Sequence, residues 1–389
     1  MAFSSQLSTS GVPIRAKRGI YTLGNDVVFD QLVALLNSIE VHVGSDMPVM
    51  ICPYDDRMDR IREEISRRPN VSIFDDQDAI ARWDEFTTRI WKTHPIASIE
   101  WQKEDGFEVH RMGVHRRFVG LDGPFDRYVY LDADILVLDS LEKIFAPLDI
   151  YDWVVYDFQH TDPTHVFNVK SPLLAQYFGI DGDNTDKLKL TQEPHQRTIQ
   201  QNIQQANQYI KSNIFCSGMY ASRSGLFSPD QYEQFIQQLA SGEADMLYHM
   251  APDQTILNYM VLRANASVYN LAHQLPPDQV TGCCVTSSHF QAPTPILPPL
   301  DAPISPASPL PTLHDRLTPL TYLHYIGISS KVFARLCAGE NIECPYRDLF
   351  LYYRYLHEPD RYPIFRGKAQ PHNPPPSFTS KVMRKLGLV

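Results

Sequence analysis

The sequence predicts an α/β protein with a mixed, mostly parallel sheet flanked by helices. Short apolar runs alternate with helical patterns between residues 19 and 76, which is typical of parallel strands joined by helices. Several of these runs end in acidic residues, at the strand ends where open sheets bind ligands. With 389 residues, 43% hydrophobic and 21% charged, the chain suits one large globular unit or two ordinary ones.

The first strands and helices follow one another closely. An apolar run at 19–23 leads through a polar turn to a helical pattern at 28–39, whose apolar residues share one face. A second strand at 48–56 precedes a charged helix at 59–68 and a third strand at 71–76. This order predicts parallel pairing, with polar turns gathered at one edge of the sheet.

The rest of the chain divides into further elements and connecting segments. Residues 80–126 and the Gln-rich stretch 181–211 are expected to be mainly helical, and further strands and helices are predicted at 128–138, 152–158, 212–227, 228–242 and 251–265. The predicted organisation is a flexible N-terminus at 1–17, one half-domain at 18–150, a second at 151–290, a Pro-rich loop at 291–311, a C-terminal part at 312–365, and a Pro-rich linker with a tail at 366–389.

Charge and hydropathy restrict the partners and the compartment. The net charge is −10, whereas a protein that binds nucleic acid needs a positive surface. The first twenty residues lack the apolar core of a signal peptide, and no run reaches the length of a membrane-spanning helix. We therefore expect a cytoplasmic protein without a nucleic-acid partner.

The six cysteines show no CxxC spacing, so reduced thiols are expected. Adjacent Cys283 and Cys284 have two interpretations. They are either a metal or redox pair, or two small buried apolar residues.

Two acidic residues interrupt the most conspicuous apolar run, which extends from Tyr128 to Leu138. Asp132 and Asp134 point to the same side if one strand continues through both. Unpaired carboxylates in apolar surroundings repel each other and are costly to desolvate, whereas a hard divalent cation with oxygen ligands removes that cost. The alternative is a pair of acids at a solvated strand end, and the apolar flanks favour the metal.

The segment YVYLDADILVL resembles the DxD segment of nucleotide-sugar glycosyltransferases with the GT-A fold. It is most similar to the family-8 retaining group, which includes glycogenin and bacterial lipopolysaccharide galactosyl- and glucosyltransferases. The resemblance spans roughly residues 18–333, with a long unmatched middle. It implies a Rossmann-like nucleotide-binding half, an acceptor half, and retaining transfer of a hexose from a UDP-sugar to a glycan or lipid-linked sugar. Mn²⁺ or Mg²⁺, held by Asp132 and Asp134, would bridge the donor's phosphates.

Two further stretches resemble the donor-binding part of this family. YTLGNDVVFDQLVALLNSI is similar to its opening strand, turn and helix, which implies that the turn holds the uridine through Thr22, Leu23, Asn25 and Asp26. HRRFVGLDGPFDRYVYLDAD places two arginines fifteen or sixteen residues before the first acid of the pair. The family has a basic residue near there that contacts the donor, which implies this role for Arg116 or its neighbour Arg117, and a donor contact for Ala133. The alternative is a pair of solvated arginines.

Sugar-contacting residues are implied by two more stretches. NIFCSGMYASRSGLF is similar to the family's Asn-x-Gly-type strand, which implies that Ser217 and Gly218 let the backbone approach the sugar. PDQTILN resembles the Asp-Gln…Asn helix start, which implies that Asp253 and Gln254 bond sugar hydroxyls and face the reacting carbon. The alternatives are a glycine at a strand bulge and an ordinary helix cap at Asp253.

The stretch LTYLHYIGISSKVF resembles the family's His-x-x-Gly-x-x-Lys-Pro-Trp ending. The resemblance implies that His324 is the third protein ligand of the metal, that Gly327 lets backbone pass near the phosphates, and that Lys331 meets the diphosphate as a point charge. Lys331 stands one residue late and Val332–Phe333 replace Pro-Trp, which weakens its phosphate role. Without the resemblance, a lone histidine is more often a packed core residue.

Two retaining routes and two other functions stay open. Asp253 or Gln254 could act from the far face of the sugar, or the leaving phosphate could deprotonate the acceptor on the front face. A haloacid-dehalogenase-like phosphohydrolase also follows an apolar strand with DxD, but its pair usually lies near the N-terminus with Thr or Val where Leu136 stands here. A non-catalytic nucleotide-sugar or carbohydrate-binding relic of the fold is the other alternative.

The tail SKVMRKLGLV combines apolar and basic residues. A short amphipathic helix there would give peripheral contact with the inner membrane face, which fits a lipid-linked acceptor. The alternative is a frayed terminus.

Overall fold

The computed structural model describes residues 16–104, 112–157, 166–168, 171, 213–276, 279–281, 283–286, 295–300, 311–315 and 318–372. The expectations for residues 1–15, for the helix at 181–211 and for the tail after residue 372 lie outside these ranges. The Pro-rich loop is described only at 295–300 and 311.

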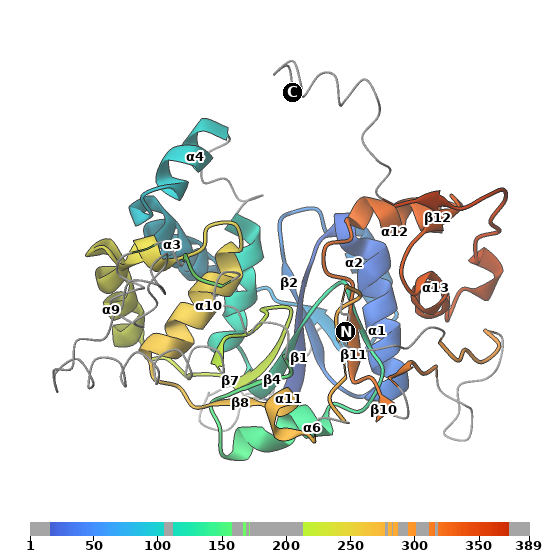
Figure 1. The fold of residues 1–389 in the computed structure, drawn as a ribbon, viewed down its shortest axis with the longest axis horizontal. Helices are drawn as coiled ribbons and strands as arrows, with labels where there is room; N and C mark the ends of the chain where they lie inside the picture. The colour runs from blue at the N-terminus through green and yellow to red at the C-terminus, as the bar shows by residue number, and fades with distance from the viewer. Residues whose placement is uncertain are drawn as a thin grey trace, which may run out of the picture.

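Within these ranges, seven strands form a central sheet in the order β3-β2-β1-β4-β7-β6-β8 (Figure 1). Its strands are β1 (Ala16–Gly24), β2 (Val49–Pro53), β3 (Val71–Ile73), β4 (Phe125–Asp132), β6 (Trp153–Val155), β7 (Met219–Arg223) and β8 (Val268–Asn270). β1 runs parallel to β2 and β4, β2 to β3, and β6 to β8, whereas β7 is antiparallel to β4 and β6. The predicted mixed, mostly parallel sheet is confirmed.

Helices cover both faces of this sheet because its strands are apolar on both sides (Figure 1). Ile20 packs into the core on one face and its neighbour Tyr21 into the core on the other, as the two-residue period of a strand requires. One face carries α1 (Phe29–His42) and α2 (Asp59–Ile65). The other carries α3 (Gln77–Thr93), the 3₁₀ helix η2 (Gly113–Leu121), α9 (Pro229–Ala240) and α10 (Pro252–Arg263). α4 (Ala97–Glu104) and η5 (Glu243–Met246) extend this layer.

The predicted helix starts follow local chemistry. Ser228 and Gln231 form a reciprocal capping box before α9, and Pro252 occupies the first turn of α10, where its missing N–H costs no bond. The helix predicted at 59–68 ends at Ile65, and the strand predicted at 71–76 ends at Ile73.

A second, two-stranded sheet pairs β5 (Ile135–Val137) with β11 (Tyr322–His324) in antiparallel fashion. After β11, the helices α12 (Ser330–Cys337) and α13 (Arg347–Arg354) pack against α1 around a third apolar core. Short elements complete the described chain: η1 (Asp26–Val28), α6 (Glu142–Phe145), η3 (Ala146–Asp149), α11 (Leu271–Gln274), β9 (His314–Asp315), β10 (Thr318–Pro319), β12 (Ile342–Glu343), η6 (Pro359–Arg361) and β13 (Gln370–Pro371).

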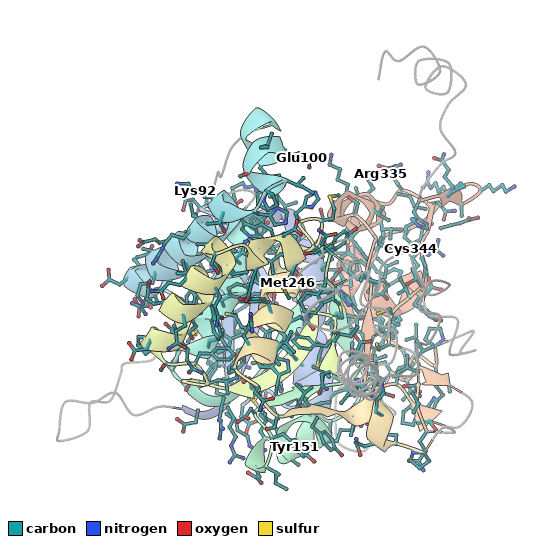
Figure 2. The ribbon with its side chains drawn as sticks, turned by 60° about the vertical axis from the view of Figure 1, so that its left-hand side comes forward. Lys92, Glu100, Tyr151, Met246, Arg335 and Cys344 are labelled. Atoms are coloured by element: carbon teal, nitrogen blue, oxygen red, sulfur yellow. The ribbon has the colours of Figure 1, made fainter. Side chains whose placement is uncertain are left out.

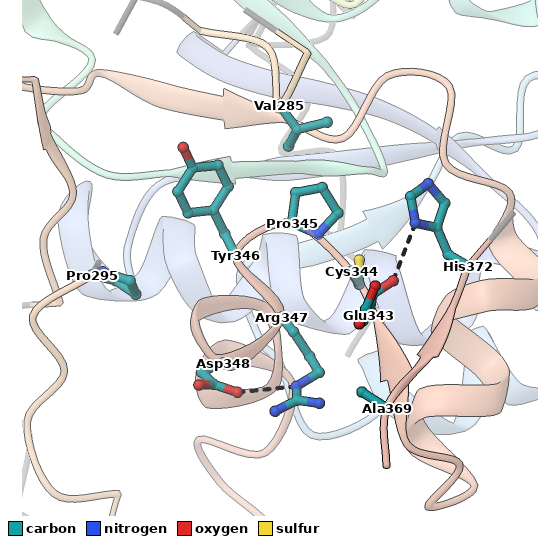
Figure 3. Close-up of a pocket in the computed structure, with 10 residues that line it drawn as sticks. All are labelled: Val285, Pro295, Glu343, Cys344, Pro345, Tyr346, Arg347, Asp348, Ala369 and His372. Carbon is teal, nitrogen blue, oxygen red and sulfur yellow. Dashed lines mark hydrogen bonds and ion pairs between the residues drawn. The ribbon is translucent and has the colours of Figure 1, made fainter. Parts of the chain in front are cut away.

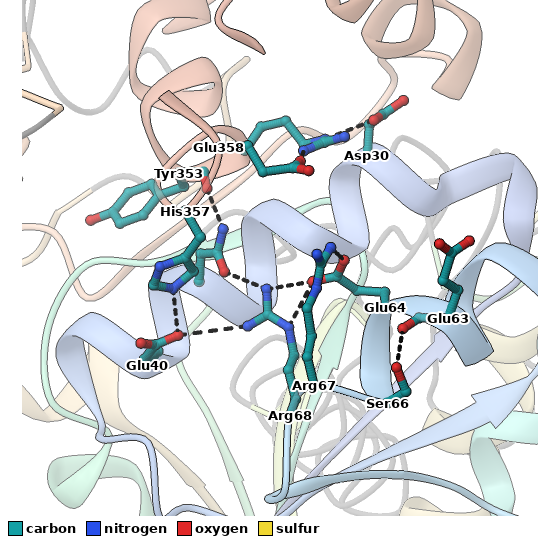
Figure 4. A network of polar contacts seen from close by, with 12 residues as sticks. Asp30, Glu40, Glu63, Glu64, Ser66, Arg67, Arg68, Tyr353, His357 and Glu358 are labelled. Carbon is teal, nitrogen blue, oxygen red and sulfur yellow. Dashed lines mark hydrogen bonds and ion pairs between the residues drawn. The ribbon is translucent and has the colours of Figure 1, made fainter. Parts of the chain in front are cut away.

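A polar network joins the C-terminal part to the sheet layer (Figure 4). The guanidinium of Arg68 pairs with Glu64 at 2.7 Å and donates to the side-chain oxygen of Asn37 at 2.6 Å. Asn37 in turn donates to the main-chain oxygen of Tyr353 in α13 at 2.6 Å. The C-terminal helices are therefore tied to α1 and α2 by buried and half-buried polar bonds as well as by apolar packing.

None of the helices in the described ranges has the length and apolar character that crossing a bilayer requires.

Candidate metal and donor site

The acid pair lies where the chain leaves one sheet for the other. β4 ends at Asp132, residues Ala133 and Asp134 form a turn, and β5 begins at Ile135. The amide of Asp132 donates to Gly218 at 2.8 Å within the central sheet, whereas the carbonyl of Asp134 accepts from Tyr325 at 3.0 Å in the second sheet. The condition that one strand continues through both acids is therefore not met, because each acid bonds to a different sheet, whereas the pair does lie at the C-terminal end of β4.

This turn lies at the edge of the central sheet where the parallel strands β1 and β4 end. Leu23 at the end of β1 pairs with Asp132 at the end of β4, and the two strands are parallel. The polar turn after β1 and the acid pair therefore lie at the same edge, as the sequence predicts.

The second sheet brings His324 to the acid pair. His324 pairs with Ile135 across the β5–β11 ladder, so its ring reaches back over the turn. Its Nε2 lies 3.2 Å from Oδ1 of Asp134 and 3.9 Å from Oδ2 of Asp132. Ligand atoms of the three residues all lie within 4.8 Å of one another, and no other group of three acids, histidines or cysteines converges in this way in the described part of the chain.

This donor set fits a hard divalent cation. Neighbouring ligands of an octahedral Mg²⁺ at roughly 2.0–2.1 Å lie about 3 Å apart, so the observed spacings need only small adjustments. Two carboxylate oxygens and one imidazole nitrogen suit Mg²⁺ or Mn²⁺ better than a soft metal. The predicted ligands Asp132, Asp134 and His324 are thus brought together.

The charges of the three groups are strongly coupled. Burial raises the pKa of Asp132, with Arg117 opposing and Asp134 adding to this effect. Burial would also raise the pKa of Asp134, but the charge of His324 and a hydrogen bond from it lower that pKa. Burial would lower the pKa of His324, yet Asp134 raises it well above its usual value. A protonated imidazole therefore neutralises Asp134 when no cation is bound.

Gly218 and Cys216 form the wall behind His324. A Cβ on Gly218 would lie 2.4 Å from Cε1 and 2.8 Å from Nδ1 of His324, so only glycine lets the ring sit there. The Cys216 thiol accepts from the Gly218 amide at 3.4 Å and is also hydrogen-bonded to His324. Sequence reasoning missed Cys216, whose only signal was its place next to Ser217 and Gly218.

A buried arginine connects the acid pair to α10. Arg117 is 4% exposed, and its guanidinium nitrogens lie 3.0 Å from Asp132 and 3.0 Å from Asp253. It also donates to the main-chain oxygen of Ser217 at 3.0 Å and lies over the ring of Tyr130 at 4.7 Å. Of the two adjacent arginines, Arg117 is therefore the one that reaches the acid pair.

Ser217 is held by the start of α10. Its hydroxyl donates to Asp253 at 2.7 Å, and its amide donates to the side-chain oxygen of Gln254 at 3.1 Å. Asn258, one turn later, bonds both main-chain groups of Phe215. The predicted residues Ser217, Gly218, Asp253 and Gln254 thus lie together beside the acid pair.

The turn after β1 has internal partners. Asn25 accepts from the amide of Val27 at 3.1 Å and donates to Asp55 at 2.9 Å, and Asp26 accepts from two amides at the start of α2. Thr22 is fully buried, and its hydroxyl has no partner among the described residues. Leu23 is 7% exposed. Asn25 and Asp26 therefore shape this turn through side-chain bonds.

The remaining predicted residues lie around this centre. Arg116 pairs with Asp84 of α3 at 2.8 Å and donates to the carbonyl of Pro53 at the end of β2. Gly327 has φ +80°, a backbone conformation that a residue with a side chain rarely adopts. Lys331 is exposed in the first turn of α12, and its ammonium has no ionic partner in the described ranges.

Comparisons with known proteins give structural matches alone. No protein-family model and no curated protein matches the sequence. Apo WbbM, a bifunctional glycosyltransferase, is 15% identical with a TM-score of 0.47, covering 90% of this chain and 52% of WbbM. The galactosyltransferase LgtC, solved with donor and acceptor sugar analogues, is 14% identical with a TM-score of 0.42 over 82% of this chain and 94% of LgtC. Mouse xyloside xylosyltransferase 1 is 11% identical with a TM-score of 0.42 over 66% of this chain and 85% of that protein.

This chain spans about half the length of WbbM. Each of these solved structures is a glycosyltransferase by its name, which is the class that the sequence resemblance names.

Proposed function

We propose that this protein is a metal-dependent hexosyltransferase that moves a sugar from a UDP-sugar to a hydroxyl of a glycan or lipid-linked sugar, with retention. The observation that carries the proposal is the convergence of Asp132, Asp134 and His324 at the carboxyl edge of the sheet. Separate sheets supply these residues, and the position is where open α/β sheets bind nucleotides.

The residues of the site have distinct proposed roles. Asp132, Asp134 and His324 would hold Mn²⁺ or Mg²⁺, which when bound supplies positive charge for the diphosphate leaving group. Arg117 fixes Asp132 by a buried ion pair, so the carboxylate is oriented before the donor arrives. Lys331 offers a further cation toward the same negative charge.

Donor and sugar contacts follow from the same edge. The turn of Thr22, Leu23, Asn25 and Asp26 would bind the uridine mainly through its backbone. The side chains of Thr22, Leu23 and Asn25 are buried, and the carboxylate of Asp26 caps α2. Ala133 and Gly218 would lie against the donor beside the acid pair, Gly327 near the phosphates, and Arg116 at the rim. These assignments are part of the proposal.

The environment of Asp253 favours the front-face route. Its carboxylate pairs with Arg117 at 3.0 Å and accepts from Ser217 at 2.7 Å. A nucleophile held by a buried guanidinium has its charge already neutralised, which reduces its reactivity. We therefore propose that Asp253 and Gln254 hold Ser217 and the sugar. The leaving phosphate would take the proton from the acceptor hydroxyl.

Trapping experiments test this assignment. Mass spectrometry of the enzyme quenched during turnover with a fluorinated UDP-sugar should show no sugar on the peptide that contains Asp253. A glycosylated Asp253 would establish double displacement instead.

Calorimetry with UDP and Mn²⁺, followed by an assay for sugar release and transfer from a panel of UDP-sugars, tests the function itself. We expect UDP binding to require Mn²⁺, and Asp134→Asn should abolish the Mn²⁺-dependent part of the UDP affinity. Binding without turnover would support a non-catalytic relic. Phosphate release from simple esters would support the phosphohydrolase.

A further inference from the structure

A cavity of about 780 Å³ lies in the C-terminal part, between β12 and the start of α13 (Figure 3). Its volume is within the range of small-molecule sites. In Figure 3, the rings of Tyr346 and Pro345 lie between Val285 and the ion pair of Arg347 and Asp348. An apolar platform thus adjoins groups that can donate and accept hydrogen bonds.

Tyr346, which lines this cavity, occupies an unusual backbone conformation. Its φ is +50° and its ψ is +35°, in the left-handed region that residues with side chains rarely adopt. Its carbonyl accepts from the first turn of α13 and from the hydroxyl of Tyr325 at 3.1 Å. A tyrosine at a position where glycine would be less strained indicates that its ring has a use.

The charges of the lining favour an uncharged ligand. Arg347 already pairs with Asp348 at 3.2 Å and donates to Asn341 at 2.9 Å, so its positive charge is compensated. Glu343 adds a negative charge at the rim, which disfavours phosphates and carboxylates. Aromatic and proline faces beside a carboxylate and a fixed guanidinium match the apolar faces and hydroxyl groups of a neutral sugar.

The cavity is connected to the candidate metal ligand by two hydrogen bonds, one from a backbone amide and one from the side-chain hydroxyl of Tyr325. Val285, which lines it, donates its amide to the carbonyl of His324 at 3.0 Å. Tyr325, the residue after His324, bonds the carbonyl of Tyr346. A ligand in the cavity would therefore be held on the other side of β11 from the acid pair.

We infer that this cavity is a second binding site, for a neutral oligosaccharide. Its use as an anchor for the acceptor glycan rests on the proposed function, whereas saccharide binding itself does not. Residues Tyr346 and Pro345 supply the platform, and Glu343 and Arg347 bond the hydroxyls.

Binding is tested on the full chain with maltotetraose, cellotetraose, mannotetraose and galactotetraose, by saturation-transfer NMR and calorimetry. EDTA is present and nucleotide is omitted, so a failure of the metal site does not affect the result. At least one tetrasaccharide should bind, with at least tenfold weaker binding to Tyr346→Gly and unchanged binding to Tyr151→Gly. Tyr151 is a half-buried tyrosine that contacts Tyr269, and it lies at the bottom of Figure 2, away from Cys344 in the lining of the cavity.

Tyr346→Gly should keep its melting temperature, because glycine suits the left-handed conformation. If Tyr346→Gly melts at a lower temperature, Glu343→Gln is the variant that tests the site, because Glu343 is exposed and its substitution leaves the core unchanged. A several-fold weaker binding to Glu343→Gln supports the site, and unchanged binding overturns it. Absence of binding by all four tetrasaccharides, or equal binding to Tyr346→Gly, also overturns it.

Discussion

A single hydrogen in place of a side chain allows His324 to reach the acid pair. Gly218 touches the edge of the imidazole, and its amide also bonds the Cys216 thiol that contacts the same ring. Ring orientation in metal sites depends on such surrounding contacts. The metal site is therefore sensitive to substitutions that add bulk behind the ring.

Gly218→Ala should weaken Mn²⁺ binding by at least tenfold, about 1.4 kcal/mol. The added methyl would lie 2.4 Å from Cε1 of His324 and 3.2 Å from Oδ2 of Asp132, so the ring must move. Gly24→Ala, at the end of β1, is the matched control, because its methyl meets the side chains of Leu32, Val28 and Ile61 at 3.5 Å or more. Equal Mn²⁺ affinities for the two variants in calorimetry would contradict this account.

Metal affinity should rise with pH. Asp134 raises the pKa of His324 in the metal-free protein, so the proton must leave before the imidazole can bind a cation. Below the raised pKa each binding event releases a proton, and the dissociation constant falls as pH rises toward that pKa. Calorimetry in buffers of different ionisation enthalpy measures the proton. An affinity that is independent of pH between 6 and 8, with no released proton, would exclude His324 as a ligand.

Two adjacent arginines show what a sequence can and cannot specify at the scale of one residue. The resemblance located a basic residue before the acid pair, and Arg116 and Arg117 both satisfied that pattern. Neighbouring residues of a helical turn point in different directions, so only the packing of η2 determines which side chain enters the core. Arg117 does, whereas Arg116 bonds Asp84.

At the scale of elements, the turn after β4 determines the site. An apolar run was sufficient to predict a buried strand, but a change of hydrogen-bond partner within the run leaves no mark on hydrophobicity. Asp132 completes the ladder with β7, and Ile135 starts another with β11. The partner strand β11 lies nearly two hundred residues later in the sequence, so the resemblance alone predicted that His324 would join the pair.

Arg117 is expected to be a major source of stability for the contact between β4 and α10. Arg117→Met would leave the buried Asp253 and the half-buried Asp132 without their common partner, which should cost about 3–5 kcal/mol. Urea unfolding measures the loss. Arg117→Met combined with Asp253→Asn should recover part of it.

Arg89→Met serves as the surface control, because Arg89 and Glu233 are 42% and 54% exposed as side chains. That pair should contribute about 0–1 kcal/mol. If Arg117→Met and Arg89→Met unfold at the same urea concentration, the buried pairs do not support the fold in this way.

For the whole molecule, the C-terminal part is packed against the first half of the chain, residues 18–150. Its strand β11 pairs with β5, its helix α13 packs on α1, and Arg354 of α13 bonds Asp30 of α1 at 2.7 Å. The alternation of strands and helices predicted the sheet, and the family resemblance implied two halves followed by a C-terminal part. The sequence did not predict these contacts, because apolar residues in α12 and α13 identify a buried face and not the surface that covers it.

The described part of the chain should therefore unfold as one unit. The four tryptophans report on the central sheet and the helices packed on it, since Trp83, Trp91 and Trp101 lie in residues 18–150 and Trp153 lies in β6. Hydrogen exchange at the amides of α13 reports on the C-terminal part. Both probes should give the same midpoint in urea, and Mn²⁺ at a hundredfold excess over its dissociation constant should stabilise both by about 2.7 kcal/mol. The cation would affect both probes because the acid pair lies in residues 18–150 and His324 lies in the C-terminal part. Exchange in α13 at a lower urea concentration than the tryptophan transition, without response to Mn²⁺, would show that the C-terminal part folds independently.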